Sequence, residues 1–206
     1  MIMESSGQAA AILLASGFSK RFGGQNKLLL PFHDKPLARY TLELAMEIGF
    51  SGGVFFVAAS DEVSALAHDL PGVKLIKNSA PEKGQRESVR LGVEAADADY
   101  YLFFVCDQPF LNTETVRLIL EARRQGCITE PRFHGKPGNP CLFSASFRDE
   151  LLSLGEGETP RLIKERHPET IRAVEAASQS VLEDIDDMEA FKRLLKLPPP
   201  NGKGRW

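Results

Sequence analysis

The amino-acid sequence predicts an α/β fold with a doubly wound, mostly parallel β-sheet. Two observations lead to this prediction. Apolar runs of strand length recur in the first half of the chain without polar alternation, which is typical of strands buried on both faces of a parallel sheet. Stretches of helical periodicity separate these runs, so each strand can return to the sheet through a right-handed crossover. Ligands of such folds bind at the carboxyl ends of the strands.

The elements expected before residue 127 follow this alternation. Strands are expected at residues 9–15, 53–59, 73–78 and 100–105. Helices are expected at residues 36–50, 61–70, 85–96 and 113–125. The first helix is predicted because apolar residues from Leu37 to Ile48 recur on one side. Asp61 and Asn112 are the predicted N-caps of the second and fourth helices.

The pattern changes after residue 127. The segment ITEPRFHGKPGNPCLFS is rich in proline and glycine and predicts a small β-hairpin that leaves the parallel repeat. Two short helices, one more short strand at VLEDIDD and a last helix at MEAFKRLLKL are expected to follow, the two helices at residues 145–153 and 159–166. The prediction is therefore one domain, residues 1–197, with a flexible C-terminal tail at residues 198–206.

The composition excludes several classes of protein. The 206 residues carry a formal net charge of -3, which argues against a nucleic-acid partner because such partners require many cations. Three cysteines without CxxC spacing favour free thiols in a reducing cytosol over disulfides or a zinc site. No apolar stretch approaches the roughly 20 residues that span a bilayer. We expect a cytoplasmic protein with no membrane and no nucleic-acid partner.

A glycine-rich basic segment follows the first strand. In LLASGFSKRFGGQNKLLL, glycines let an anion approach the backbone closely, and Lys20, Arg21 and Lys27 supply countercharge. The segment matches neither the Walker pattern nor GxGxxG. A solvated basic turn is the alternative interpretation.

A second signal is the acid at the end of the fourth strand, in YYLFFVCDQPF. Asp107 would lie on the ligand side of the sheet, where a carboxylate is a hard-oxygen ligand for Mg²⁺. Its alternative role is to cap the following turn. A basic glycine loop together with such an acid is what a nucleoside triphosphate with Mg²⁺ requires.

These segments resemble a known family. LLASGFSKRFGGQNKLLL is similar to the nucleotide-binding signature of the molybdenum cofactor nucleotidyltransferases, and VCDQPF is similar to their metal-binding strand end. GQRESVRLG, KPGNPCLF and EDIDDMEAF extend the resemblance in the same order. The most similar branch comprises the molybdopterin cytidylyltransferases and related accessory proteins of molybdenum hydroxylases. The resemblance implies a Rossmann-like fold of the nucleotide-diphospho-sugar transferase type.

The resemblance also implies roles for individual residues. The platform for the base and ribose would consist of Leu14, Ala15, Ser16 and Gly17, completed by Gly84, Gln85 and Ser88. Arg21 and Lys27 would hold the triphosphate, and these two residues with Asp107 form the expected catalytic set. The expected pterin-side residues are Gln108, Asn139, Pro140 and Arg161, of which Arg161 could instead be a helix-surface residue.

The implied metal ligands are Asp107 and Asp186, with Asp184 as the alternative second ligand. The acidic residues around Asp186 could instead begin the last helix, where the helix dipole favours them.

The implied activity is Mg²⁺-dependent transfer of CMP from CTP to molybdopterin, with a molybdenum hydroxylase as a possible acceptor of the product. Three departures from the family pattern, at Ser16, Asn139 and the pair Arg86 and Glu87, weaken the choice of CTP over GTP. Alternatives are a guanylyl or sugar-phosphate nucleotidyltransferase, or a non-catalytic molybdopterin-binding accessory protein.

Overall fold

The computed structural model describes residues 7–17 and 19–200, and its core is an eight-stranded sheet. The strand order is β10-β7-β9-β6-β1-β4-β5, with β8 paired to β7. The bounds are β1 Ala9–Ala15, β4 Val54–Ala58, β5 Val73–Lys77, β6 Tyr100–Val105, β7 Ile128–Phe133, β8 Lys136–Pro137, β9 Cys141–Ser144 and β10 Ile171–Glu175. Strand β9 pairs antiparallel with β6 and β7, and β8 pairs antiparallel with β7. The other pairs in this sheet are parallel. The predicted fold class and the hairpin after residue 127 are confirmed.

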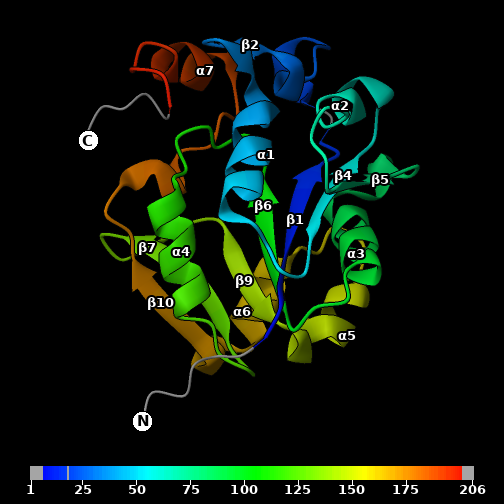
Figure 1. The fold of residues 1–206 in the computed structure, drawn as a ribbon, viewed down its shortest axis with the longest axis vertical. Coiled ribbons are helices and arrows are strands. Elements are labelled where there is room, and N and C mark those ends of the chain that lie inside the picture. Colours follow the sequence, from blue (N-terminus) through cyan, green and yellow to red (C-terminus); the bar gives the residue numbers. More distant parts are fainter. Residues whose placement is uncertain (1–6, 18, 201–206) are drawn as a thin grey trace.

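Helices cover both faces of this sheet (Figure 1). The helices are α1 Leu37–Ile48, α2 Asp61–Ala65, α3 Gln85–Ala95, α4 Thr113–Glu121, α5 Arg148–Leu152, α6 Pro160–Arg166 and α7 Met188–Leu194. Helices α1, α2 and α4 pack on one face and α3, α5 and α6 on the other, so β1 and β6 are buried on both sides. None of the helices in the described part of the chain is long and apolar enough to cross a membrane.

Two strand predictions were wrong in detail. Strand β5 is at the edge of the sheet, and Lys74, Leu75 and Lys77 are exposed rather than buried on both faces. VLEDIDD is not a strand: it contains part of a 3-10 turn, Gln179–Leu182, and the strand of this region is β10. The backbone of this segment bonds to other parts of the chain instead of to a sheet ladder, as described below.

One of the two predicted N-caps is confirmed and the other is wrong. Asn112 accepts a hydrogen bond from the Thr115 amide at 2.9 Å, which confirms it as the N-cap of α4. The N-cap of α2 is Ser60 and not Asp61, because the Ser60 hydroxyl accepts from the Val63 amide. Helix α2 is also shorter than predicted. The predicted flexible tail lies mostly outside the described residues.

A third hydrophobic cluster joins residues 22–40 to the C-terminal region. It contains Phe22 from the glycine-rich segment, Phe32 just after that segment, Tyr40 from α1, and Ile185 and Phe191 from the C-terminal region. The Phe32 and Phe191 rings meet edge to face with centroids 5.7 Å apart. Figure 1 shows the result, with α7 beside β2 (Pro31–Phe32) above the sheet. This packing brings the acidic segment before α7 to the carboxyl ends of the strands.

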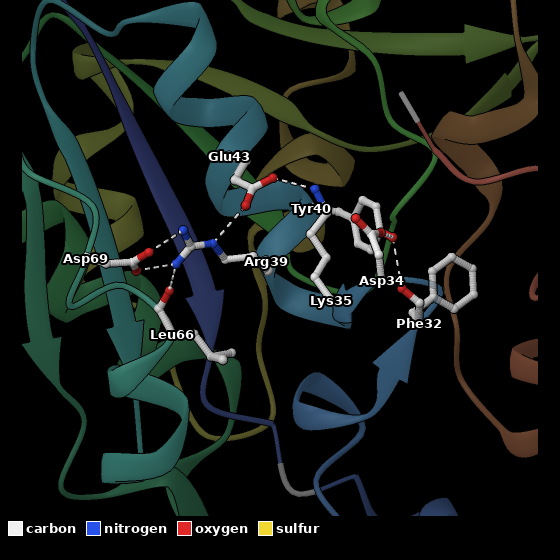
Figure 2. Close-up of polar contacts among 8 residues, drawn as sticks. All are labelled: Phe32, Asp34, Lys35, Arg39, Tyr40, Glu43, Leu66 and Asp69. Carbon is white, nitrogen blue, oxygen red and sulfur yellow. Dashed lines mark hydrogen bonds and ion pairs between the residues drawn. The ribbon is translucent and has the colours of Figure 1, made fainter. Parts of the chain in front are cut away.

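An ion-pair network holds the chain that follows Lys27 against the rest of the molecule (Figure 2). Arg39 on α1 binds Glu43, the backbone oxygen of Leu66, and Asp69. The Tyr40 hydroxyl lies 2.8 Å from both the Phe32 backbone oxygen and an Asp34 carboxylate oxygen. Burial and the Asp34 hydrogen bond raise the pKa of Tyr40. Its proton is therefore retained, and the hydroxyl fixes the turn between β2 and β3 (Lys35–Pro36) onto α1.

Candidate active site

A cavity of about 240 Å³ lies where strands β1 and β6 end. Eight residues expected at the nucleotide or the metal line it: Leu14, Ser16, Gly17, Lys27, Gly84, Gln85, Ser88 and Asp107. The cavity is therefore at the carboxyl edge of the sheet, where open α/β folds bind ligands.

Lys27 is at the centre of the charged groups of this cavity. Its Nζ lies 2.5 Å from Oδ2 of Asp107, 2.8 Å from the backbone oxygen of Ile185 and 3.4 Å from Oδ1 of Asp186. Its side chain is only 15% exposed. The three contacts match the three protons of an ammonium group. Sequence positions 27, 107 and 186 thus converge on one point.

Local hydrogen bonds fix the backbone at Lys27. Residues Lys27–Leu29 form a 3-10 turn whose N-cap, Asn26, accepts from the Leu28 amide at 3.1 Å. The Lys27 amide donates to the Ser19 hydroxyl at 3.0 Å. The glycine-rich segment therefore closes on itself before Lys27. Sequence reasoning did not identify Ser19 or Asn26 as positioning residues, although serine and asparagine are typical caps of such turns.

Asp107 is partly buried, with its side chain 13% exposed. One oxygen binds Lys27, whereas Oδ1 is buried and has no hydrogen-bond partner among the described residues. A buried carboxylate oxygen without a partner costs free energy unless a ligand satisfies it. The position and chemistry of this oxygen fit a divalent cation, which prefers carboxylate ligands.

Two further carboxylates stand near Asp107. Asp186 is 59% exposed and reaches Lys27, as described above. Burial and the negative charges of Asp107 and Asp186 raise the pKa of Asp184. Within the described residues, no three His, Cys, Asp or Glu side chains are grouped so as to hold a metal ion by themselves. A cation here would need further oxygen ligands, and nucleotide phosphates can supply them.

The acidic segment is tied to Asp107 through the backbone. The Ile185 amide donates to the Asp107 backbone oxygen at 3.0 Å, and the Ile185 side chain is buried in the third hydrophobic cluster. These contacts place Asp184 and Asp186 on either side of a fixed residue. Sequence reasoning identified both acids but had no signal for Ile185.

The predicted base pocket is formed by the start of α3. Gly84 has a positive φ of 80°, which allows the turn before the helix, and Ser88 lies one turn inside it. The buried Asn78 accepts from the Ala80 amide and donates to the Ser88 hydroxyl at 3.1 Å. The proton of Ser88 is consequently left for another acceptor. Asn78 was missed because nothing in its local sequence indicates a link to α3.

Arg86 and Glu87, the unusual charges in this segment, do not line the cavity formed by the described residues. Arg86 donates to the backbone oxygens of Lys83 and Leu154. Glu87 pairs with Arg90, and this hydrogen bond lowers the pKa of Glu87. Their charges therefore stabilise α3 rather than contact a bound base directly.

Two other predicted nucleotide residues are not at the cavity wall. Ala15 is 2% exposed and packs in the core. Arg21 is exposed on the 3-10 turn Lys20–Phe22 and is not among the described residues that line the cavity. Ser16 does line it, but its hydroxyl donates to the Val57 backbone oxygen at 3.2 Å. Contact of Arg21 with a triphosphate remains a prediction.

A second cavity, of about 620 Å³, adjoins the first. The two share the lining residues Leu14, Gln85 and Val105, so they are neighbouring parts of one cleft. Asn139 and Arg161, which are expected on the pterin side, line this second cavity. Arg161 is 81% exposed and pairs with Glu165.

Gln108 and Pro140 are not among the described residues that line either cavity. Gln108 is 2% exposed, and its amide donates to the Val181 backbone oxygen, which also accepts from the Asn139 amide. The position of Gln108 therefore fits a brace between β6 and the turn Gln179–Leu182 better than a contact with the pterin.

Residues 11–171 match the model of the MobA-like NTP transferase domain. The chain belongs to the MobA-like NTP transferase domain family. This membership confirms the family resemblance, and the chain is a nucleotidyltransferase by family.

Two curated relatives of this chain have different names. A nicotine blue oxidoreductase of Paenarthrobacter nicotinovorans is 26% identical over 193 residues, or 89% of this chain and 95% of that protein. A molybdenum cofactor guanylyltransferase of Cupriavidus metallidurans is 28% identical over 174 residues, or 75% of this chain and 78% of that protein.

Solved structures share the fold of this MobA-like chain. A nucleotidyl transferase from Methanothermobacter has a TM-score of 0.80 at 22% identity and covers 91% of this chain and 95% of its own. Rv0371c of Mycobacterium tuberculosis in complex with manganese has a TM-score of 0.70 at 24% identity, with 92% of this chain and 98% of its own covered.

Proposed function

We propose that this MobA-like protein transfers CMP from CTP to the phosphate of molybdopterin cofactor, with Mg²⁺ required, to give molybdopterin cytosine dinucleotide and pyrophosphate. The observation that carries the proposal is the meeting of Lys27 with Asp107 and Asp186 at the wall of the smaller cavity. Relatives named as molybdenum cofactor guanylyltransferases support molybdenum cofactor as the acceptor.

In the reaction, a phosphate oxygen of the acceptor attacks the α-phosphorus of CTP in line. The new P–O bond forms as the α–β anhydride bond breaks, and pyrophosphate leaves. The protein must neutralise two anions and align them, and no covalent enzyme intermediate is required. The base would occupy the smaller cavity and the pterin the larger one, with the reacting phosphates near their shared wall at Leu14, Gln85 and Val105.

Lys27 must exchange a partner when the triphosphate binds, because its three protons already have acceptors. Its contact with Asp186 is the longest of the three, and Asp186 is the more exposed carboxylate. We infer that this contact opens first, which frees Lys27 to donate to a phosphate and frees Asp186 as a ligand.

The proposed ligands of Mg²⁺ are Asp107, through its unpaired Oδ1, and Asp186, with Asp184 the alternative. A cation held by these carboxylates would supply positive charge to the phosphates and to the leaving pyrophosphate. The manganese complex of the structural neighbour supports a divalent cation in this fold.

The choice of CTP rests on the sequence resemblance, whereas several curated relatives are named guanylyltransferases. Purified protein should therefore be assayed with molybdopterin, Mg²⁺ and each of the four nucleoside triphosphates, with pyrophosphate and the dinucleotide product measured. CTP is expected to be the best substrate. A higher kcat/KM for GTP would overturn the base assignment while leaving the transferase proposal in place.

The first mutational prediction concerns Asp107. Asp107→Asn should lower kcat by about 10²- to 10³-fold, because it weakens the proposed Mg²⁺ ligand and removes the carboxylate that pairs with Lys27. Asp97→Asn, at an exposed carboxylate, is the matched control and should retain the wild-type rate. If the wild type and Asp107→Asn release equally little pyrophosphate while molybdopterin still binds, the protein is a carrier and not an enzyme.

A further inference from the structure

The larger cavity contains an ion-pair cluster that the proposed transfer does not use. Glu130 on β7 has a side chain that is only 3% exposed. One of its carboxylate oxygens accepts from Arg132 at 2.9 and 3.0 Å, and the other accepts from Lys164 on α6 at 2.9 Å. All three side chains line the cavity, together with Cys141, whose Sγ lies 3.5 Å from the Lys164 ammonium.

The cluster carries more positive than negative charge. Glu130 offsets only one of its two cations. The other charged residues of the cavity wall, Arg161 and Glu165, pair with each other at 2.8 Å. One positive charge is therefore uncompensated among the described residues that line this cavity. Lys164 is only 18% exposed, so water screens this charge incompletely.

Donors also remain available. Lys164 has three ammonium protons, and its contacts are Glu130 and the weakly accepting Cys141 sulfur. Arg132 binds Glu130 through Nε and Nη2, which leaves Nη1 without a partner within the described part of the chain. Glu130 thus orients two cations without using all of their donors.

We propose that Lys164 and Arg132, oriented by Glu130, form an oxyanion-binding subsite for a second anionic group of the acceptor, distinct from the phosphate that reacts. The proposal rests on the proposed function for the identity of the cavity as the acceptor site. An acceptor would then bind at two points, with its reacting phosphate at the shared wall of the cavities and an oxyanion at Lys164. The volume of about 620 Å³ is in the range of ligand pockets.

The direct test uses inorganic molybdate and sulfate as oxyanion probes, titrated calorimetrically at constant ionic strength. Wild-type protein should bind both, and Lys164→Met should weaken binding at least tenfold. Arg132→Met tests the same subsite if Lys164→Met fails to fold. Arg166→Met is the matched control, because Arg166 is on the same helix, pairs with Glu158 and is not part of the cluster. The control should bind the probes like the wild type.

A kinetic test distinguishes recognition of the acceptor by Lys164 from a purely structural role of this residue. Lys164→Met should raise KM for the acceptor at least tenfold and leave KM for CTP within twofold, and Lys164→Arg should restore most of the affinity. Molybdate should compete with the acceptor but not with CTP. A folded Lys164→Met protein with unchanged probe binding and unchanged acceptor KM would overturn the subsite.

The two proposals fail differently. Absence of pyrophosphate release from every protein would defeat the proposed transfer, whereas probe titration would still measure the subsite. Loss of probe binding in Lys27→Met but not in Lys164→Met would place the oxyanion at the triphosphate position and overturn the subsite alone.

Discussion

At the scale of single residues, the site depends on how one ammonium group is surrounded. Lys27 and Asp107 form an ion pair whose two side chains are 15% and 13% exposed. Removal of one partner from such a pair leaves the other charge poorly compensated. The ion pair therefore holds the Lys27 side chain in a fixed position in the absence of a nucleotide. Its geometry uses acceptors from two separate segments of the chain, at Asp107 and at residues 185–186.

Lys27→Arg tests whether that geometry or the charge alone matters. A planar guanidinium cannot reach three acceptors arranged around a compact ammonium. We expect CTP binding to be retained within a fewfold and kcat to fall at least tenfold. Single-turnover measurement of the chemical step is the appropriate assay. Lys192→Arg, at an exposed residue of α7, is the control, and a wild-type kcat in Lys27→Arg would show that charge alone suffices.

At the scale of elements, α3 must approach β1 closely enough to form the proposed base pocket. Gly92 faces β1, and a Cβ at this position would lie 2.4 Å from Cγ2 of Ile12. Ile12 is completely buried, so it has little room to move. The glycine therefore sets the distance between helix and sheet, and with it the placement of Gln85 and Ser88.

In Gly92→Ala, helix propensity and steric fit have opposite effects on the free energy of unfolding. Alanine favours a helix over glycine by about 1 kcal/mol, whereas overpacking of a core costs roughly 1 to 3 kcal/mol. We expect the clash to prevail and the free energy of unfolding to fall by about 1 kcal/mol. Chemical denaturation would measure the change. Glu94→Ala, at an exposed residue of the same helix, should stay within about 0.5 kcal/mol of the wild type.

Helix α3 should also show a pH-dependent stability from Glu87. Its hydrogen bond to Arg90 lowers its pKa below the ordinary value of 4.5, against the effect of burial. A lowered pKa in the folded state means that the stabilisation is present above pH 4.5 and is lost as the pH falls through the lowered value.

Glu87→Gln should therefore reduce the free energy of unfolding at pH 7 by roughly 1 kcal/mol. The difference from the wild type should shrink as the pH is lowered below 4.5. Urea denaturation at a series of pH values would measure it. A difference that is constant across the series would mean that shape, and not charge, explains the effect.

At the scale of the whole molecule, the proposed active site is assembled by contacts between residues 22–40 and the C-terminal region. The third hydrophobic cluster packs Phe191 of α7 against Phe32 and buries Ile185 beside them. This cluster lies outside the two sheet cores. It determines whether the acidic segment reaches Asp107 and Lys27.

Phe191→Leu should loosen this assembly without touching the sheet. We expect the Mg²⁺ concentration for half-maximal rate to rise severalfold, because Asp186 is then less well placed, and KM for CTP to change less. Phe50→Leu is the control: Phe50 also makes an edge-to-face contact, with Phe104, but in the core on the α1 side. Equal shifts in Mg²⁺ dependence in both variants would indicate general destabilisation.

The sequence by itself determined most of the local elements. It also determined the two parts of the proposed site that each lie within one continuous segment. The apolar runs predicted β1, β4 and β6, and the glycine-rich segment and Asp107 were recognisable because a loop or strand end with its own chemistry is contiguous in sequence. Their common position could also be inferred, since the carboxyl ends of parallel strands lie at one edge.

The tertiary structure alone decided the contacts of Ile185 and Asp186 with Lys27, the brace formed by Gln108, the edge position of β5 and the cluster of Glu130 with Lys164. Each depends on residues that are far apart in the sequence; Lys27 and Ile185, for example, are separated by 158 positions. Local periodicity shows which face of an element is apolar but not which distant face covers it. Packing of the whole chain determines which faces meet, because the sheet order and the third hydrophobic cluster form only when distant segments come together.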